Sequence, residues 1–171
     1  MHKRKKSKKR SAKLYMKMIL SKKLTLPFKL IGNNIDTILA NKLSRELEGK
    51  CNNEGFIKPG SVSLITYSSG IIKGNDVLFD ISYECHVCRP VEGLKISCII
   101  RNVTKAGIRA EINSKHSPLI IFIARDHHHQ SKYFSKQKEG NIITIRVIGQ
   151  RFELNDKYIS VIATLVEPKS I

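Results

Sequence analysis

Residues 94–112 show the period-two alternation of a half-buried hairpin, and this pattern constrains the fold more than any other in the chain. The apolar side chains that fall on one side are Leu94, Ile96, Cys98, Ile100, Ile108, Ala110 and Ile112. Between the two runs, Asn102–Gly107 supplies turn residues, and the predicted turn is centred on Gly107. We therefore expect a long strand, a short turn and a second strand, with a basic outer face.

Three further strand-like runs follow the hairpin, at residues 119–124, 141–148 and 157–165. A polar connection at residues 125–139, long enough for a loop or a short helix, separates the first two, and a turn around Asn155–Asp156 separates the last two. Five short strands with a longer insertion after the third predict a small Greek-key barrel of the OB type, which binds oligonucleotides on one strand face. A β-sandwich fragment would give a similar pattern.

The preceding region has the pattern of a small α+β domain. Residues 12–26 alternate as a strand does, and strand candidates follow at 56–67 and 77–87. Asn33–Glu48 is the clearest helix, because its apolar residues recur at spacings of three and four. We expect Asn33 or Asn34 to cap it and Gly49 to end it. These apolar residues are Ile35, Ile38, Leu39, Leu43 and Leu47.

The formal net charge of +17 is unevenly distributed along the chain. Residues 1–23 carry 11 Lys or Arg and no acid, residues 24–88 have a net charge of −1, and residues 89–171 have a net charge of +7. A near-neutral section followed by a positive one indicates a docking module joined to a polyanion-binding module. Residues 1–11 form a basic leader, expected to be disordered, which fits a nuclear-import signal, a nucleic-acid tether or a solvated tail.

No apolar run in the chain reaches the length of about 18 residues that a membrane-spanning helix needs, so no membrane association is expected. The first residues lack the features of a secretory signal, so we do not expect secretion. Four cysteines without a dense framework indicate free thiols in a reducing compartment.

The order of these pieces resembles the stalk subunit of archaeal and eukaryotic RNA polymerases, which is subunit seven of RNA polymerase II and, in archaea, the E′ subunit. The pieces are KLSRELEGKC (42–51), GFIKPGSV (55–62), SGIIKGNDVLFDISYECHVCRPVEG (69–93), KAGIRAEI (105–112) and IRVIGQRFELNDKYISVIATL (145–165). Each piece is weak alone, and their order across about residues 12–168 carries the resemblance. The abundance of Lys, Asn and Ile, together with the short chain, suggests a version from a large DNA virus or a parasite.

The resemblance implies a tip domain at residues 12–88 that docks on the polymerase core and an S1-type OB barrel at residues 89–168 that binds nascent single-stranded RNA. It also implies stalk subunit four as a partner, no catalysis, no cofactor, and action at the site of transcription, whether in a nucleus or, for a virus, in the cytoplasm or virion. The alternative is a free-standing S1-type RNA-binding factor in translation or RNA turnover.

The candidate RNA contacts are the basic residues of the predicted barrel surface and the aromatic residues of its polar connection. They are Lys95, Arg101, Lys105, Arg109, Arg146, Tyr133 and Phe134. Phe122 is a third nearby aromatic residue that could stack on a base, but it is assigned to the core, because LIIFIA (119–124) is apolar on both faces. Stacking is not expected at Arg109, where relatives often carry an aromatic residue.

Two other chemistries compete with this interpretation. Cys85 and Cys88, together with His127–His129, could hold zinc. However, the two thiols of a CxxC within a strand would point to opposite faces, so no metal site is expected. Asp126 beside the histidines could orient an imidazole for acid–base catalysis. No nucleophile motif or phosphate-binding loop accompanies it, so we do not expect an enzyme.

Overall fold

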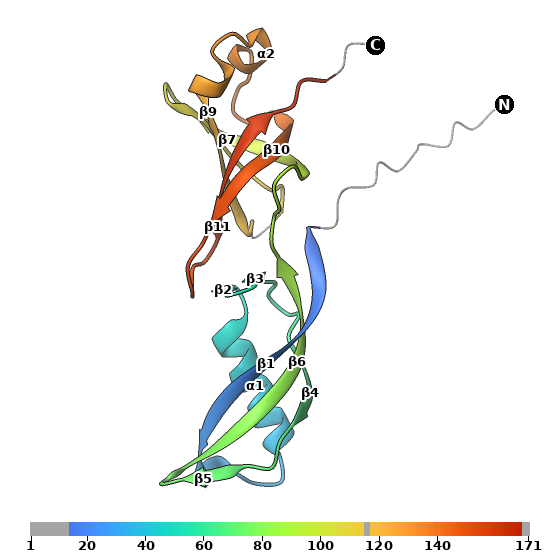
Figure 1. Ribbon diagram of the computed structural model, residues 1–171, viewed down its shortest axis with the longest axis vertical. Coiled ribbons are helices and arrows are strands. Elements are labelled where there is room, and N and C mark those ends of the chain that lie inside the picture. The colour runs from blue at the N-terminus through green and yellow to red at the C-terminus, as the bar shows by residue number, and fades with distance from the viewer. Residues whose placement is uncertain (1–13, 115–116, 169–171) are drawn as a thin grey trace, which may run out of the picture.

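The computed structural model describes residues 14–114 and 117–168. The predicted basic leader, residues 1–11, lies outside these ranges. Figure 1 shows an elongated molecule with an α+β tip at one end and a closed barrel at the other. The predicted fold class, a strand-and-helix tip domain followed by an OB-type barrel, is confirmed.

The tip is built around two long strands, β1 (Tyr15–Pro27) and β6 (Asp76–Cys88), which pair antiparallel along their whole length. Four short strands complete the sheet by pairing with β6 or with each other. They are β2 (Cys51–Asn52), β3 (Gly55–Ile57), β4 (Ser63–Tyr67) and β5 (Ile71–Lys73). A short 3-10 helix, η1 (Phe28–Leu30), follows β1 at the end of the tip that is far from the barrel (Figure 1).

One helix, α1 (Ile35–Leu47), packs on the tip sheet, as the apolar spacing predicts. Leu39, Leu43 and Leu47 are buried, and they share a core with side chains of β1 and β6. Asn34 occupies the predicted cap position, but its side chain makes no capping hydrogen bond. Gly49 adopts φ of 72°, which lets the chain leave the helix in a left-handed conformation.

The barrel contains five strands in the order β10-β11-β9-β8-β7, and β10 closes it by pairing with β7. The strands are β7 (Lys95–Val103), β8 (Gly107–Glu111), β9 (Leu119–Ala124), β10 (Ile142–Arg151) and β11 (Ile159–Leu165). Strands β11 and β9 pair parallel, while the other barrel pairs are antiparallel, which is the arrangement of an OB barrel. The predicted alternation is present, since Ile96, Cys98 and Ile100 are buried.

The centre of the turn between β7 and β8 lies two residues earlier than predicted. Residues 104–106 form it, and Gly107 is the first residue of β8. A Cβ at Gly107 would lie 2.2 Å from the carbonyl oxygen of Ile123 on β9. The glycine therefore permits close approach of two strand backbones.

The polar connection after β9 contains η2 (Arg125–His128) and a single-turn helix, α2 (Lys132–Ser135). The Ser131 hydroxyl caps α2 by accepting a hydrogen bond from the backbone N–H of Phe134 at 3.1 Å. Within the described ranges, neither this helix nor α1 is long and apolar enough to cross a membrane.

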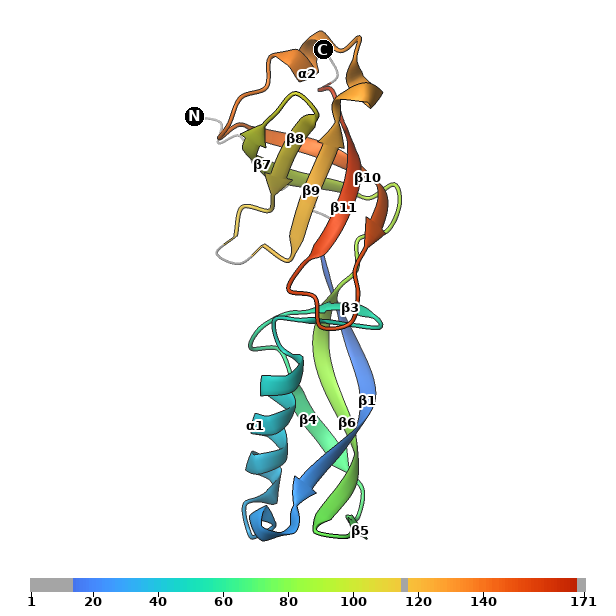
Figure 2. The same ribbon diagram turned by 90° about the vertical axis from the view of Figure 1, so that its left-hand side faces the viewer.

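The loop between β10 and β11 reaches the tip, as Figure 2 shows beside β3. The backbone N–H of Cys51 donates to the carbonyl oxygen of Asp156 at 2.7 Å, and the N–H of Asn155 donates to the carbonyl oxygen of Cys51 at 2.8 Å. Phe56 and Cys88, both from the tip, are buried in the same core as the barrel residues. The two parts are thus joined by backbone hydrogen bonds and by shared apolar packing.

Candidate nucleic-acid interface

The structure divides the predicted basic contacts into two groups. Arg101, Lys105 and Arg109 lie together at the β7–β8 turn end of the hairpin, and all three are exposed. Lys95 lies at the other end of β7, where it is the direct partner of Arg146 in the pairing of β7 with β10. The predicted cluster is therefore not a single surface.

The first group belongs to a row of side chains that crosses the outer face of three strands. Arg109 of β8 lies opposite Phe122 of β9, which in turn lies opposite Ile162 of β11. The exposed fractions of Phe122 and Ile162 are 40% and 51%. A cation, an aromatic ring and an aliphatic side chain thus adjoin on an open strand surface.

Glu111 holds the two arginines of this surface. Its carboxylate accepts a hydrogen bond from Arg101 Nε at 3.2 Å and lies 3.5 Å from an Arg109 Nη atom. Both arginine side chains remain about half exposed. One carboxylate therefore orients two guanidinium groups and leaves the pair with a net positive charge.

The assignment of Phe122 to the core is wrong. Leu119, Ile121 and Ile123 are fully buried, so the period-two alternation of β9 places Ile120 and Phe122 on the outer face. Apolar residues on both faces hid this from the sequence. The sequence of β9 alone does not tell which of its two apolar faces points into the barrel. That depends on how β9 pairs with the hairpin formed by β7 and β8.

The assignment of Phe134 as a base-stacking residue is also wrong. Its exposed fraction is 2%, and its ring stacks on His128 with centroids 5.1 Å apart. The guanidinium of Arg125 lies 5.3 Å from the ring centroid. These contacts leave the Phe134 ring too enclosed to accept a base. Tyr133, the neighbouring candidate, is partly buried against the barrel core.

Arg125 positions the β7–β8 turn, a role that the sequence did not reveal. Its Nε donates to the carbonyl oxygen of Lys105 at 2.8 Å, and an Nη atom donates to that of Thr104 at 3.0 Å. Its backbone N–H donates to the carbonyl oxygen of Ala106 at 3.0 Å. The turn that presents Lys105 is thereby tied to the end of β9. No spacing rule in the sequence points to these long-range contacts.

Of the three consecutive histidines, only His128 packs against the rest of the barrel. His128 is within hydrogen-bond distance of two backbone groups, while His127 and His129 are exposed. His129 Nδ1 lies 3.1 Å from the backbone oxygen of Asp126. A carboxylate-oriented imidazole is not present among the described residues.

The two thiols of the CxxC face different cores, as strand geometry predicts. Cys85 belongs to the tip core and Cys88 to the barrel core. Burial raises the pKa of Cys85 to about 11 and that of Cys88 to about 12, so both stay protonated at neutral pH. Zinc binds thiolates. Within residues 14–114 and 117–168, no three metal-binding side chains come together.

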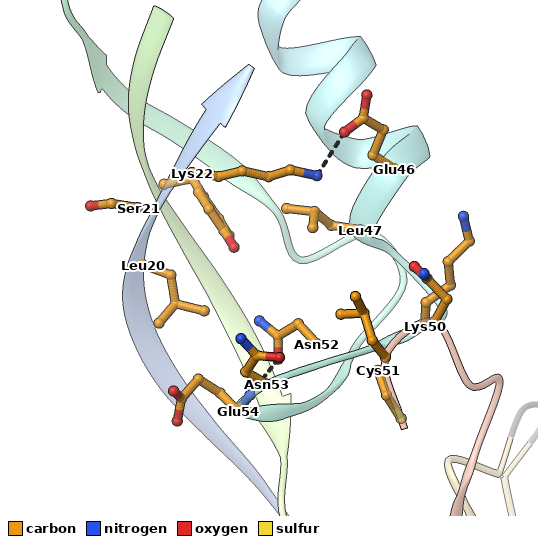
Figure 3. A pocket seen from close by; sticks show the side chains of 13 residues that line it. Leu20, Ser21, Lys22, Glu46, Leu47, Lys50, Cys51, Asn52, Asn53 and Glu54 are labelled. Atoms are coloured by element: carbon orange, nitrogen blue, oxygen red, sulfur yellow. Dashed lines mark hydrogen bonds and ion pairs between the residues drawn. The ribbon is translucent and has the colours of Figure 1, made fainter. Parts of the chain in front are cut away.

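A cavity of about 440 Å³ lies where the β10–β11 loop meets the tip (Figure 3). Charged and amide side chains line much of its wall, and Lys22 forms an ion pair with Glu46 at 2.7 Å across part of it. Leu154 and Asn155 contribute from the barrel side. The cavity is therefore formed jointly by both parts of the molecule.

Comparison with known proteins identifies relatives of one kind. A protein assigned as a DNA-directed RNA polymerase subunit in Acanthamoeba polyphaga mimivirus is 27% identical over an alignment 171 residues long. This alignment covers 90% of this chain and 83% of the relative. DNA-directed RNA polymerase II subunit 7 of Arabidopsis thaliana is 25% identical over 114 residues, 66% of this chain and 62% of the relative.

Subunit rpb7 of RNA polymerase II from Dictyostelium discoideum is 29% identical over 113 residues, 65% of this chain and 63% of the relative. The chain thus matches less than two thirds of the length of these cellular relatives, and more of the mimivirus protein. No family model matches the chain. The chain is thus similar to DNA-directed RNA polymerase subunits of the subunit-seven type, as the resemblance in its sequence predicts.

Proposed function

We propose that the chain is a non-catalytic stalk subunit of a multisubunit DNA-directed RNA polymerase. In this proposal the tip domain, residues 12–88, docks on the polymerase core, and the S1-type barrel, residues 89–168, binds the nascent transcript. The protein acts at the site of transcription. The likeness to polymerase subunits supports this reading over a free-standing S1 factor, because the match to the mimivirus relative covers 90% of the chain and so extends beyond the barrel.

The main support for RNA binding is the row of exposed side chains Arg109, Phe122 and Ile162 on the outer face of β8, β9 and β11. Aromatic rings accept stacked bases without regard to sequence, and nearby arginines attract the phosphates. Phe122 provides an open ring on β9, and Arg109 lies directly opposite it on β8. Arg101 is held beside Arg109 through Glu111. These groups suit a single-stranded chain whose bases are unstacked and turned toward the protein.

The far end of the tip supports docking. Four large apolar side chains are exposed there, and two of them line a cavity of about 730 Å³. They are Phe28, Leu30, Ile71 and Ile72. Ile72 has an exposed fraction of 66% and lines the cavity with Phe28. Contiguous exposed apolar side chains mark protein-binding surfaces, and the core subunits of the polymerase are the partners proposed for this end.

The proposal includes subunit four as a second partner. The resemblance implies that this subunit packs along both domains. The cavity in Figure 3, to which both the tip and the β10–β11 loop contribute, is a surface of the required kind. Its lining of lysine, glutamate and asparagine side chains suits a polar contact.

Two variants of the barrel test the RNA-binding part of the proposal. Phe122→Ala removes the stacking ring, and we expect single-stranded RNA affinity, measured by fluorescence anisotropy, to fall roughly five- to a hundredfold. Arg109→Ala is expected to lower affinity and to weaken its dependence on salt. Neither change should alter recovery of polymerase core subunits with the tagged protein.

Ile72→Asp is the matched counterpart at the other end of the molecule. We expect it to abolish recovery of the core subunits, identified by mass spectrometry, and to leave RNA affinity unchanged. Unchanged RNA affinity in both barrel variants would refute the RNA-binding assignment. Recovery of ribosomal or exosome proteins in place of polymerase subunits would instead support the free-standing factor.

A further inference from the structure

A like-charge pair lies on the barrel away from the Phe122 face. Lys95 and Arg146 are register partners in the antiparallel pairing of β7 with β10, and both side chains are exposed. Like charges directly opposite each other destabilise a sheet. Among the described residues, the ion pairs include neither of these side chains. The fold thus keeps two positive side chains, Lys95 and Arg146, opposite each other, and a bound anion would reduce the repulsion between them.

The neighbouring register pairs extend this surface along both strands. Ser97 lies opposite Thr144, and Ile99 lies opposite Ile142, whose exposed fraction is 68%. Two cations, two hydroxyl groups and an exposed aliphatic side chain therefore follow one another along the outer face of β7 and β10. This combination can contact a phosphate, a ribose and a base in succession.

Strand β7 connects this surface to the arginines described above. Lys95 and Arg101 are both exposed on β7, six positions apart, which corresponds to about 20 Å along a strand. Arg101 shares Glu111 with Arg109, which lies opposite Phe122. A chain of phosphates that leaves the Phe122 face at Arg101 would therefore follow β7 to reach Lys95 and Arg146.

We propose that Lys95 and Arg146 form a second phosphate-binding site, so that single-stranded RNA bound at the Phe122 face continues around β7 to the β7–β10 face. This inference rests on the proposed RNA-binding function and specifies the path of the RNA. OB barrels bind from about 4 to about 16 nucleotides, depending on the protein. A short oligonucleotide occupies the Phe122 face alone, while a long one reaches the second site.

Lys95→Glu is the informative variant. The new carboxylate lies opposite Arg146 and pairs with it, so one substitution removes both phosphate contacts. Because an opposite-charge pair replaces a like-charge pair, we expect the melting temperature to stay equal or rise. Loss of RNA affinity then cannot result from unfolding. Lys95→Gln, which removes one charge without introducing another, serves as the milder variant.

The measurement compares oligouridines of about 4 and about 16 nucleotides, the two ends of the OB range. For Lys95→Glu we expect affinity for the long oligonucleotide to fall roughly three- to tenfold and affinity for the short one to stay unchanged. The slope of log affinity against log salt for the long oligonucleotide should become shallower by about 1.4, corresponding to two lost contacts. Lys29→Glu makes the same charge change at the far end of the tip and is the control.

Equal affinity of the Lys95→Glu and Lys29→Glu variants for the long oligonucleotide would overturn the second site. Equal losses for both oligonucleotide lengths would also overturn it, because the effect would then be one of overall charge. In either case the proposed function stands if Phe122→Ala still lowers RNA affinity. It fails separately if Phe122→Ala and Arg109→Ala have no effect.

Discussion

His128 shows how a single side chain joins three segments of the barrel. The backbone N–H of Leu165 donates to Nε2 at 2.9 Å, so the ring proton sits on Nδ1, which donates to the carbonyl oxygen of Ala124 at 3.0 Å. The ring also stacks on Phe134. The imidazole therefore connects the end of β9, the end of β11 and α2.

His128→Ala is expected to lower the free energy of unfolding by about 2–4 kcal/mol. The substitution leaves the Leu165 N–H and the Ala124 carbonyl without their partner and removes an aromatic contact. Urea denaturation followed by circular dichroism measures the change. His127→Ala, at the exposed neighbour, should stay within about 0.5 kcal/mol of the original protein. Equal effects of the two substitutions would contradict the structural role.

The buried thiols make stability depend on pH in the alkaline range. Burial raises the pKa of Cys98 to about 12, above the value of about 8.5 for a thiol in the unfolded chain. Below the unfolded pKa the thiol is protonated in both states and its contribution is fully present. As pH rises toward 12 the unfolded chain releases a proton that the folded chain retains, so stability is lost.

The expected slope is about 1.4 kcal/mol per pH unit for each such thiol. Cys98→Ala removes one thiol, so its free energy of unfolding should fall less steeply between about pH 9 and about pH 11 than that of the original protein. The other ionisable groups are the same in both proteins, so their contributions cancel in the comparison. Parallel slopes for the two proteins would show that the Cys98 thiol ionises in the folded state.

The limits of sequence reasoning are visible at single residues. The exposure of Arg101 and Arg109 was predicted from strand alternation, which reports local faces correctly, and that of Lys105 from its place in the turn. Phe122 and Phe134 were assigned the wrong way round, because exposure of an aromatic side chain depends on the segments packed over it. Those segments are distant in the sequence.

At the scale of elements, close approach of β8 and β9 depends on Gly107. Any side chain there meets the Ile123 carbonyl oxygen, which belongs to the paired strand and cannot move independently. The hairpin and the third strand together present Arg109 and Phe122. Packing at one glycine therefore sets the geometry of the proposed RNA surface.

Gly107→Ala is expected to destabilise the protein by about 1–3 kcal/mol, the usual cost of overpacking, and to lower RNA affinity by separating β8 from β9. Gly149 on β10 offers the matched control, because a Cβ there meets no atom within 4 Å. Thermal melting and RNA titration of both variants check this. A Gly107→Ala protein that melts and binds RNA as the Gly149→Ala protein does would contradict the proposed role of the close approach.

Most strands and the main helix could be predicted, because their periodicity is local. The five barrel strands and α1 lie close to their predicted ranges. The two-residue strand β2 and the parallel pairing of β9 with β11 were not predicted. They depend on pairing between distant segments, which alternation within one segment does not report.

At the scale of the whole molecule, the proposed docking surface and the proposed RNA surface lie on different parts, the first on the tip and the second on the barrel. The exposed apolar side chains around Ile72 lie at the end of the tip away from the barrel, near β5 in Figure 2. The Phe122 face lies on the barrel itself. The backbone bonds at Cys51 and the shared core join the two parts. A stalk of this form can contact a polymerase and its transcript at the same time.

Site-specific crosslinking in stalled transcription complexes tests this central claim most directly. A photoreactive phenylalanine analogue is placed at position 122 in one protein and at position 72 in another, and each is assembled with the polymerase and a labelled transcript. We predict that irradiation attaches position 122 to the RNA and position 72 to a large core subunit. Labelled RNA attached at position 72 but not at position 122, or no attachment at either, would contradict the account.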